Sequence, residues 1–100
     1  MTWDTQIFRD AQLRTRHIHP YFDVARETVS GWLNGHHAPG PRFAATADQL
    51  QRAVRAAILD MALPVPRRVD LSQAEHDLRI ARVLHQYMQR EEDASLDIDN

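Results

Sequence analysis

The side chains best suited to chemistry in this sequence gather between residues 14 and 42. The run VARETVSGWLNGHHAPG, residues 24–40, sets charged and hydroxyl side chains among apolar ones, and further arginines lie on both sides of it. Every basic residue in the chain other than histidine is arginine. A guanidinium group binds two acceptors at once, which suits a phosphate or a guanine base. A GC-rich genome would give the same arginine usage, so both explanations stay open.

Metal binding and catalysis are not expected from these residues. The six histidines include the runs HIH and HH, but adjacent histidines in a loop rarely converge on zinc without a third ligand. The sequence has no glycine-rich phosphate loop and no nucleophile with a suitable base. Glu75, His76 and Asp77 are consecutive, so their side chains point apart on a helix. We therefore expect no metal, no cofactor and no enzymatic activity.

Length and composition predict a single small domain. One hundred residues, 43% of them apolar, allow a modest core. Without cysteine there is neither a disulfide nor a thiolate zinc site. No apolar run approaches about 18 residues, so we expect no membrane span and no signal peptide, and a cytoplasmic location is the simplest prediction. Residues 1–68 carry nine arginines against six acidic residues, whereas residues 69–100 carry three against eight. The positive part is therefore the one suited to phosphates.

The elements that must position these residues are helices. Period-two alternation is absent, so we expect an all-α fold, a small bundle of about five helices with a long C-terminal helix. A first helix is expected over about residues 3–14, capped by Thr2. A long helix follows the loop HHAPGPR, beginning either at Pro41 or at a capping box of Thr46 and Gln49. The prolines of LPVPRR are expected to end it.

The last helix is expected over residues 70–93, with a capping box of Ser72 and Glu75. Its apolar residues form two stripes, of which one can pack on the domain and the other needs a different cover. Self-association is therefore expected there. The dimer-interface candidates are Leu78, Ile80, Ala81, Val83, Leu84, Tyr87 and Met88. From residue 93 the chain is expected to leave the helix, and residues 93–100 to form an acidic mobile tail.

Between the first helix and the long one, two short helices joined by a tight turn are expected. Asp23 tolerates a left-handed backbone and suits the turn, and Asn34 with Gly35 supplies a helix stop. The residues expected to hold the two helices together share one face. This motif core is Phe22, Val24, Val29, Trp32 and Leu33.

This segment resembles the recognition-helix region of Cro/repressor-type phage regulators, which often read V-S-R-x-T-V-S-x-W-x-N-G. The resemblance covers about residues 15–42, including Pro39 in the following loop. The matching positions are Val24, Arg26, Thr28, Val29, Ser30, Trp32, Asn34 and Gly35. Ala25 replaces the usual Ser or Thr cap, and His19 replaces a small residue. Pro20 requires the first helix of the motif to be short, to begin near Pro20, or to be kinked.

The resemblance implies a helix-turn-helix regulator, found in phages or prophages, that binds double-stranded DNA. A homodimer would read a palindromic operator, with each second helix in a major groove. Residues 1–64 would form the DNA-binding domain and residues 65–92 the dimerisation helix. The base-contact candidates are Arg26, Glu27, Thr28, Ser30 and Gly31, where the glycine would allow close approach to the duplex. The phosphate-contact candidates are Arg14, Thr15, Arg16, Asn34, His36, His37 and Arg42.

A protein-interaction module is the alternative. A small helical adaptor, such as an antitoxin or a phage adaptor, would use the apolar face of residues 71–88 to hold a protein partner. The same wide apolar face favours a homodimer and a complex with another protein equally well.

Overall fold

The computed structural model describes residues 3–63 and 72–98, with side chains up to residue 93 in the second range. This part of the chain contains five α-helices, two short 3-10 helices and no strand, which confirms the all-α prediction. The elements in chain order are α1 (Gln6–Asp10), α2 (Thr15–Ile18), η1 (His19–Tyr21), α3 (Arg26–Leu33), η2 (Pro41–Phe43), α4 (Ala44–Leu59) and α5 (Gln73–Ile98).

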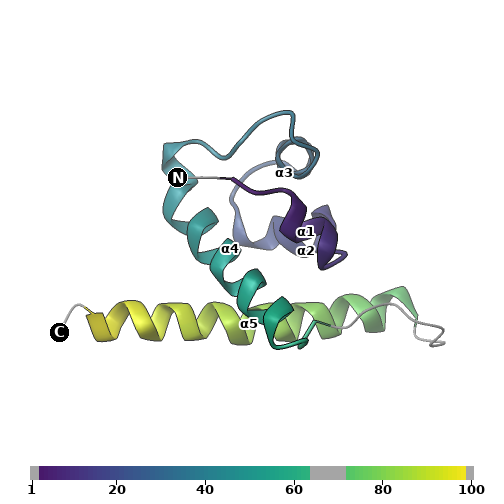
Figure 1. Ribbon diagram of the computed structural model, residues 1–100. Helices are drawn as coiled ribbons and strands as arrows, with labels where there is room; N and C mark the ends of the chain where they lie inside the picture. The colour runs from purple at the N-terminus through teal and green to yellow at the C-terminus, as the bar shows by residue number, and fades with distance from the viewer. Residues whose placement is uncertain (1–2, 64–71, 99–100) are drawn as a thin grey trace.

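The two ends of the fold differ in their surroundings. Figure 1 shows α5 as a long helix along one side of the molecule, with α3 well separated from it on the opposite side. Helix α2 contacts both α3 and α5, and α4 packs along α5. The short helices therefore carry α3 away from the acidic C-terminal segment.

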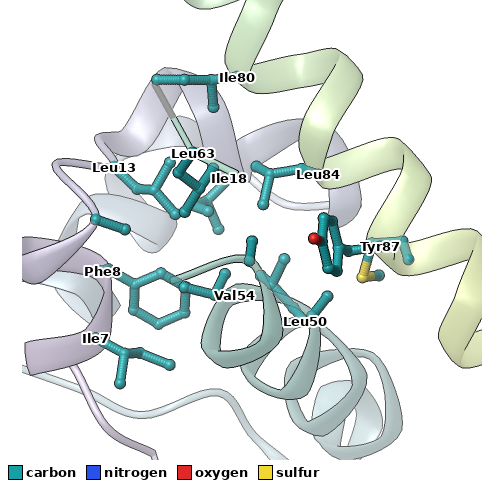
Figure 2. Close-up of a cluster of buried hydrophobic side chains, with 14 of the residues drawn as sticks. Ile7, Phe8, Leu13, Ile18, Leu50, Val54, Leu63, Ile80, Leu84 and Tyr87 are labelled. Atoms are coloured by element: carbon teal, nitrogen blue, oxygen red, sulfur yellow. The ribbon is translucent and has the colours of Figure 1, made fainter. Parts of the chain in front are cut away.

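The core fills the space between the N-terminal helices, α4 and α5 (Figure 2). The N-terminal segment contributes Phe8 and Ile18, α4 contributes Leu50, and α5 contributes Ile80 and Leu84, all at most 1% exposed. On α4 the buried residues recur at steps of three and four, as its apolar periodicity predicts. Burial of these side chains provides most of the driving force that holds α5 to the rest.

The helix boundaries differ from the predictions near both ends of the N-terminal part. Helix α1 ends at Asp10 rather than Arg14, because Gln12 takes a left-handed backbone (φ 57°) that closes the helix. Thr2, the expected cap, lies outside the described residues. Pro41 begins the 3-10 turn that leads into α4, so of the two expected starts the one at Pro41 is supported and the capping box of Thr46 and Gln49 is wrong.

Two further helix ends depart from expectation. Helix α4 ends at Leu59, before the prolines, because Met61 adopts a left-handed backbone (φ 54°). At the start of α5, Ser72 Oγ accepts from the Glu75 amide at 3.2 Å, which is the first half of the predicted capping box. Helix α5 continues to Ile98, where a tail had been expected from residue 93. No glycine or proline interrupts residues 73–98, and the helix formers Glu, Ala and Leu sustain it.

Candidate nucleic-acid interface

The segment that resembles a helix-turn-helix consists of α2 with η1, a four-residue turn, and α3. Pro20 lies within η1, so the first helix is short, one of the outcomes expected from that proline. The His19 Nε2 donates to the Val24 carbonyl at 2.8 Å and ties the turn to the preceding helix. Asp23 is exposed and its backbone is not left-handed, so the expected reason for its place in the turn is wrong. Phe22 and Ala25 make the turn with extended backbone instead.

Helix α3 is fixed through its inner face. Val29 is fully buried and Trp32 is 4% exposed, as predicted for the motif core, and Phe22 is buried with them. Val24 and Leu33 are half-buried against the same cluster. These five residues therefore form the apolar scaffold that the sequence predicted.

Aromatic rings from outside the motif complete this attachment. The Trp32 ring lies 5.0 Å from that of Phe22 and 5.4 Å from that of Phe43, between ring centres. Trp3 packs edge-on to Trp32 and donates its indole N–H to the Trp32 carbonyl at 2.9 Å. Such ring pairs add to the free energy gained by burial alone. Sequence reasoning missed Trp3 and Phe43, because both lie outside the motif and only the fold brings them to Trp32.

The C-terminal end of α3 is closed as predicted. Gly35 has φ 81°, and Asn34 caps the helix. The His36 amide donates to the Gly31 carbonyl at 2.9 Å, and the Gly35 amide donates to the Trp32 carbonyl at 3.2 Å. This pair of hydrogen bonds is the Schellman arrangement, which turns the chain sharply into the following loop.

The outer face of α3 carries the base-contact candidates. Arg26, Glu27 and Thr28 are exposed on its first turn. Ser30 is half-buried, and its Oγ accepts from the Asn34 side-chain amide at 3.3 Å. The first turn therefore presents charged and hydroxyl groups to solvent, and Ser30 is shared with Asn34.

Gly31 serves a different contact from the one expected. A Cβ at this position would lie 3.3 Å from Cδ2 of His37, so the absence of a side chain lets His37 lie against the helix. The expectation that Gly31 lets the helix approach a duplex closely stays a prediction, and the structure adds His37 as a neighbour on that side.

The phosphate-contact candidates fall into two groups. Five of them are exposed: Arg14 just before α2, Asn34, His36 and His37 at the end of α3, and Arg42 in η2. Thr15 and Arg16 are half-buried. The Nε of Arg16 donates to Asp77 of α5 at 2.8 Å, so Arg16 is directed toward α5. Arg16 is thus engaged with α5, whereas the first five remain exposed at the surface.

Polar contacts at the junction of α2 with α5 centre on His17, which sequence reasoning did not single out. Its Nδ1 accepts from the Arg14 amide at 2.9 Å, which places the proton of neutral His17 on Nε2. Nε2 donates to Asp77 Oδ1 at 2.7 Å. The pKa of His17 is lowered, chiefly by burial and also by the charges of Arg16 and His76, although the hydrogen bond and charge of Asp77 act to raise it.

The carboxylate of Asp77 is held as an anion. Its partial burial acts to raise its pKa, but hydrogen bonds from His17, Arg16 and Gln73 lower the pKa to about 2. Both ring nitrogens of His17 are therefore engaged in contacts that join α2 to α5 and to its own first turn.

The dimer-interface candidates on α5 divide between core and surface. Ile80, Leu84, Tyr87 and Met88 are at most 8% exposed and pack within the chain's own core. Assigning these four to a dimer interface is therefore corrected, because their shared face of α5 covers α4 and the N-terminal helices. Leu78 is 53% exposed, Ala81 is exposed and Val83 is half-buried.

Neither a protein family, nor a curated protein, nor a solved structure matches this chain. Within residues 3–63 and 72–98, no helix is long and apolar enough to cross a membrane. Over the same residues, no three histidine or acidic side chains are grouped as metal ligands would be. The function must therefore be argued from the geometry of α3 and its surroundings.

Proposed function

We propose that the chain is a sequence-specific regulator that binds double-stranded DNA through α3, in the manner of the Cro/repressor-type proteins that the segment resembles. The observation that carries the proposal is the division of α3 between its two faces. Val29 and Trp32 anchor the inner face, while Arg26 and Glu27 are exposed on the outer one. A short helix held in this way can enter a major groove without rearrangement of the core.

The first turn of α3 supports this mode of binding. Ala25 precedes the helix with extended backbone, and no side chain of the described residues caps it. The first amide groups of the helix are thus open to an acceptor, and a DNA phosphate is a strong one. Arg26 follows directly, where its guanidinium can form two hydrogen bonds with a guanine, and Glu27 can accept from a cytosine.

The exposed arginines of the N-terminal part allow a modest number of phosphate contacts. Arg14, Arg26 and Arg42 are exposed and form no ion pair within the described part of the chain. Three phosphate contacts correspond to a slope of roughly −3 for the logarithm of the association constant against that of salt concentration. Helix α5, which carries most of the acidic residues of the C-terminal part, lies on the opposite side of the molecule from α3 (Figure 1).

The test begins with selection of bound genomic fragments at two salt concentrations, which supplies a DNA sequence. Fluorescence anisotropy then compares the protein with its Arg26→Ala variant on that sequence. Loss of a two-acceptor base contact is expected to cost about 1–3 kcal/mol, which corresponds to a weakening of roughly 5- to 150-fold. Arg79→Ala is the matched control, because Arg79 is also exposed but lies on α5. Equal affinities of the Arg26 variant and the parent protein would refute the proposal.

A second candidate function is protein binding through the end of α4. Leu59 and Met61 are 84% and 87% exposed, and Ile58 is 36% exposed beside them. Exposed apolar side chains in a cluster are typical of contacts with another protein. If this surface, rather than α3, holds the physiological partner, a Leu59→Ser/Met61→Ser variant loses that partner while Arg26→Ala retains it.

A further inference from the structure

Helix α5 carries a second stripe of side chains that the domain does not cover. Ala74, Leu78, Ala81 and His85 recur at steps of four, three and four, and all four are exposed. This is the spacing of a and d positions in a coiled coil. Leu78 is the large apolar residue of the stripe, and the two alanines on either side of it leave room for another helix to approach closely.

The charges that border this stripe have opposite signs. Glu75 and Arg82 are seven residues apart, so they occupy the same flanking position of successive heptads. Both are exposed, and neither forms an ion pair within the described residues. In an antiparallel pair of identical helices, this flanking position meets its own counterpart in the partner. Glu75 then faces Arg82 of the second copy, and Arg82 faces its Glu75.

We propose that two copies of this chain pair through α5 in antiparallel orientation, with Leu78 near the two-fold axis and two Glu75–Arg82 ion pairs beside it. The occupant of this face is a second copy, because the surface is complementary to itself in charge. In a parallel pair, Glu75 and Arg82 would instead meet the opposite flank of the partner's stripe. That flank consists of Asp77 and Leu84, which face the chain's own domain, so a parallel pair is disfavoured.

The position of the stripe around α5 sets the arrangement of the two domains. Residues are rotated by about 100° each around a helix, which places Ala81 about 60° and Leu78 about 120° from the buried Leu84. The partner helix therefore lies beside α5, not beneath it. The two-fold axis of an antiparallel pair is perpendicular to the plane that contains the two helices. Because α3 lies across the molecule from α5 (Figure 1), this axis points toward the α3 side, and the α3 helices of both copies then lie on the same side of the dimer. The use of that arrangement to read a two-fold operator rests on the proposed function, whereas the pairing itself does not.

Sedimentation equilibrium of the full chain over a concentration series tests the pairing. The parent protein is expected to be a dimer and Leu78→Glu a monomer. Glu75→Arg and Arg82→Glu, which each place like charges together twice per dimer, are expected to weaken the dimer roughly tenfold. The double variant Glu75→Arg/Arg82→Glu is expected to restore the parent affinity. Arg79→Glu, an equal charge change on α5 outside the stripe, is the control and leaves the dimer unchanged. Circular dichroism establishes that each variant is folded.

A parent protein that stays monomeric, or charge variants whose double combination is weaker than either single one, overturns the pairing. DNA binding is measured separately on a single half-site, where a monomer suffices. Half-site binding by a protein that stays monomeric would refute the α5 pairing and support the regulator proposal. Dimerisation with charge rescue but without DNA binding would support the pairing and refute the regulator proposal.

Discussion

Helices α3 and α5 are attached to the same core by different kinds of contact. The inner face of α3 lies in an aromatic cluster around Trp32, whose own backbone carbonyl accepts from Trp3. Along α5 the buried stripe that includes Ile80 and Leu84 is bordered by polar contacts. Asp77 accepts from Arg16 and His17 of α2 at one end, and Tyr87 donates to Asp60 at 2.7 Å further along. Near the C-terminal part, Arg52 of α4 donates to Glu91 at 2.8 Å.

The two kinds of contact differ in how they respond to pH. The aromatic rings around Trp32 carry no charge, so these ring contacts do not themselves depend on pH. The border of α5 depends on ionised groups whose protonation removes a contact. Helix α3 is therefore held by aromatic burial, whereas the N-terminal part of α5 is also held by hydrogen bonds from Arg16 and His17 to the carboxylate of Asp77.

The largest expected effect comes from breaking the aromatic attachment of α3. Trp32→Ala removes a ring that is 4% exposed and leaves a cavity among Phe22, Phe43 and Trp3. The expected loss is about 3–5 kcal/mol in the free energy of unfolding, measured by urea denaturation. Leu59→Ala is the control: its side chain is 84% exposed, and a change within about 0.5 kcal/mol is expected. A Trp32 variant as stable as the control would show that the cluster does not hold α3.

A smaller effect is expected from the polar border of α5. Asp77→Asn removes the anion that accepts from Arg16 and His17, and we expect it to lower the free energy of unfolding at neutral pH by about 1–2 kcal/mol. Because the pKa of Asp77 is lowered to about 2 from 3.8, its contribution is present above pH 3.8 and lost as the pH falls toward 2. Urea denaturation across this range is expected to show a shallower acid dependence for the variant than for the parent protein.

His17 adds a second, milder pH dependence. Since folding lowers the pKa of His17 below 6.5, its contribution is complete above pH 6.5 and declines as the pH falls through the lowered value. Protonation at Nδ1 would also remove the acceptor for the Arg14 amide. His17→Asn keeps a side-chain acceptor but does not titrate, so its stability is expected to fall less between pH 7.5 and 5.5. An unchanged slope in this variant would contradict the assignment.

The sequence predicted the parts of this fold that depend on local spacing. The apolar steps from Val29 to Trp32 and Leu33, and the stop at Gly35, are each determined within a few residues. The shortness of the first motif helix followed from Pro20 for the same reason. These local rules also predicted which side of α3 would be exposed at Arg26.

What the sequence did not reveal are the contacts between distant segments. Two apolar stripes on α5 are equally visible in the sequence, and only the docked α4 shows that Ile80 and Leu84 belong to the covered one. The pairing of His17 with Asp77 joins residues 60 apart. Likewise, the sequence did not show that His37 of the following loop lies against Gly31.

The smallest expected effect concerns how the two neighbouring helices end. The residue with a left-handed backbone that follows the end of α3 is Gly35, whereas the one that follows the end of α4 is Met61. A side chain in that region costs about 1–2 kcal/mol, and glycine avoids this at an entropic cost of about 0.5–1 kcal/mol. Met61 is 87% exposed, so Met61→Gly loses little burial and is expected to raise the free energy of unfolding by up to about 1 kcal/mol in urea denaturation. Gly35→Ala is the reciprocal change: no atom lies within 4 Å of the added Cβ, so a loss of about 1 kcal/mol would come from backbone strain alone. A destabilised Met61 variant would mean that its side chain contributes a contact that outweighs this strain.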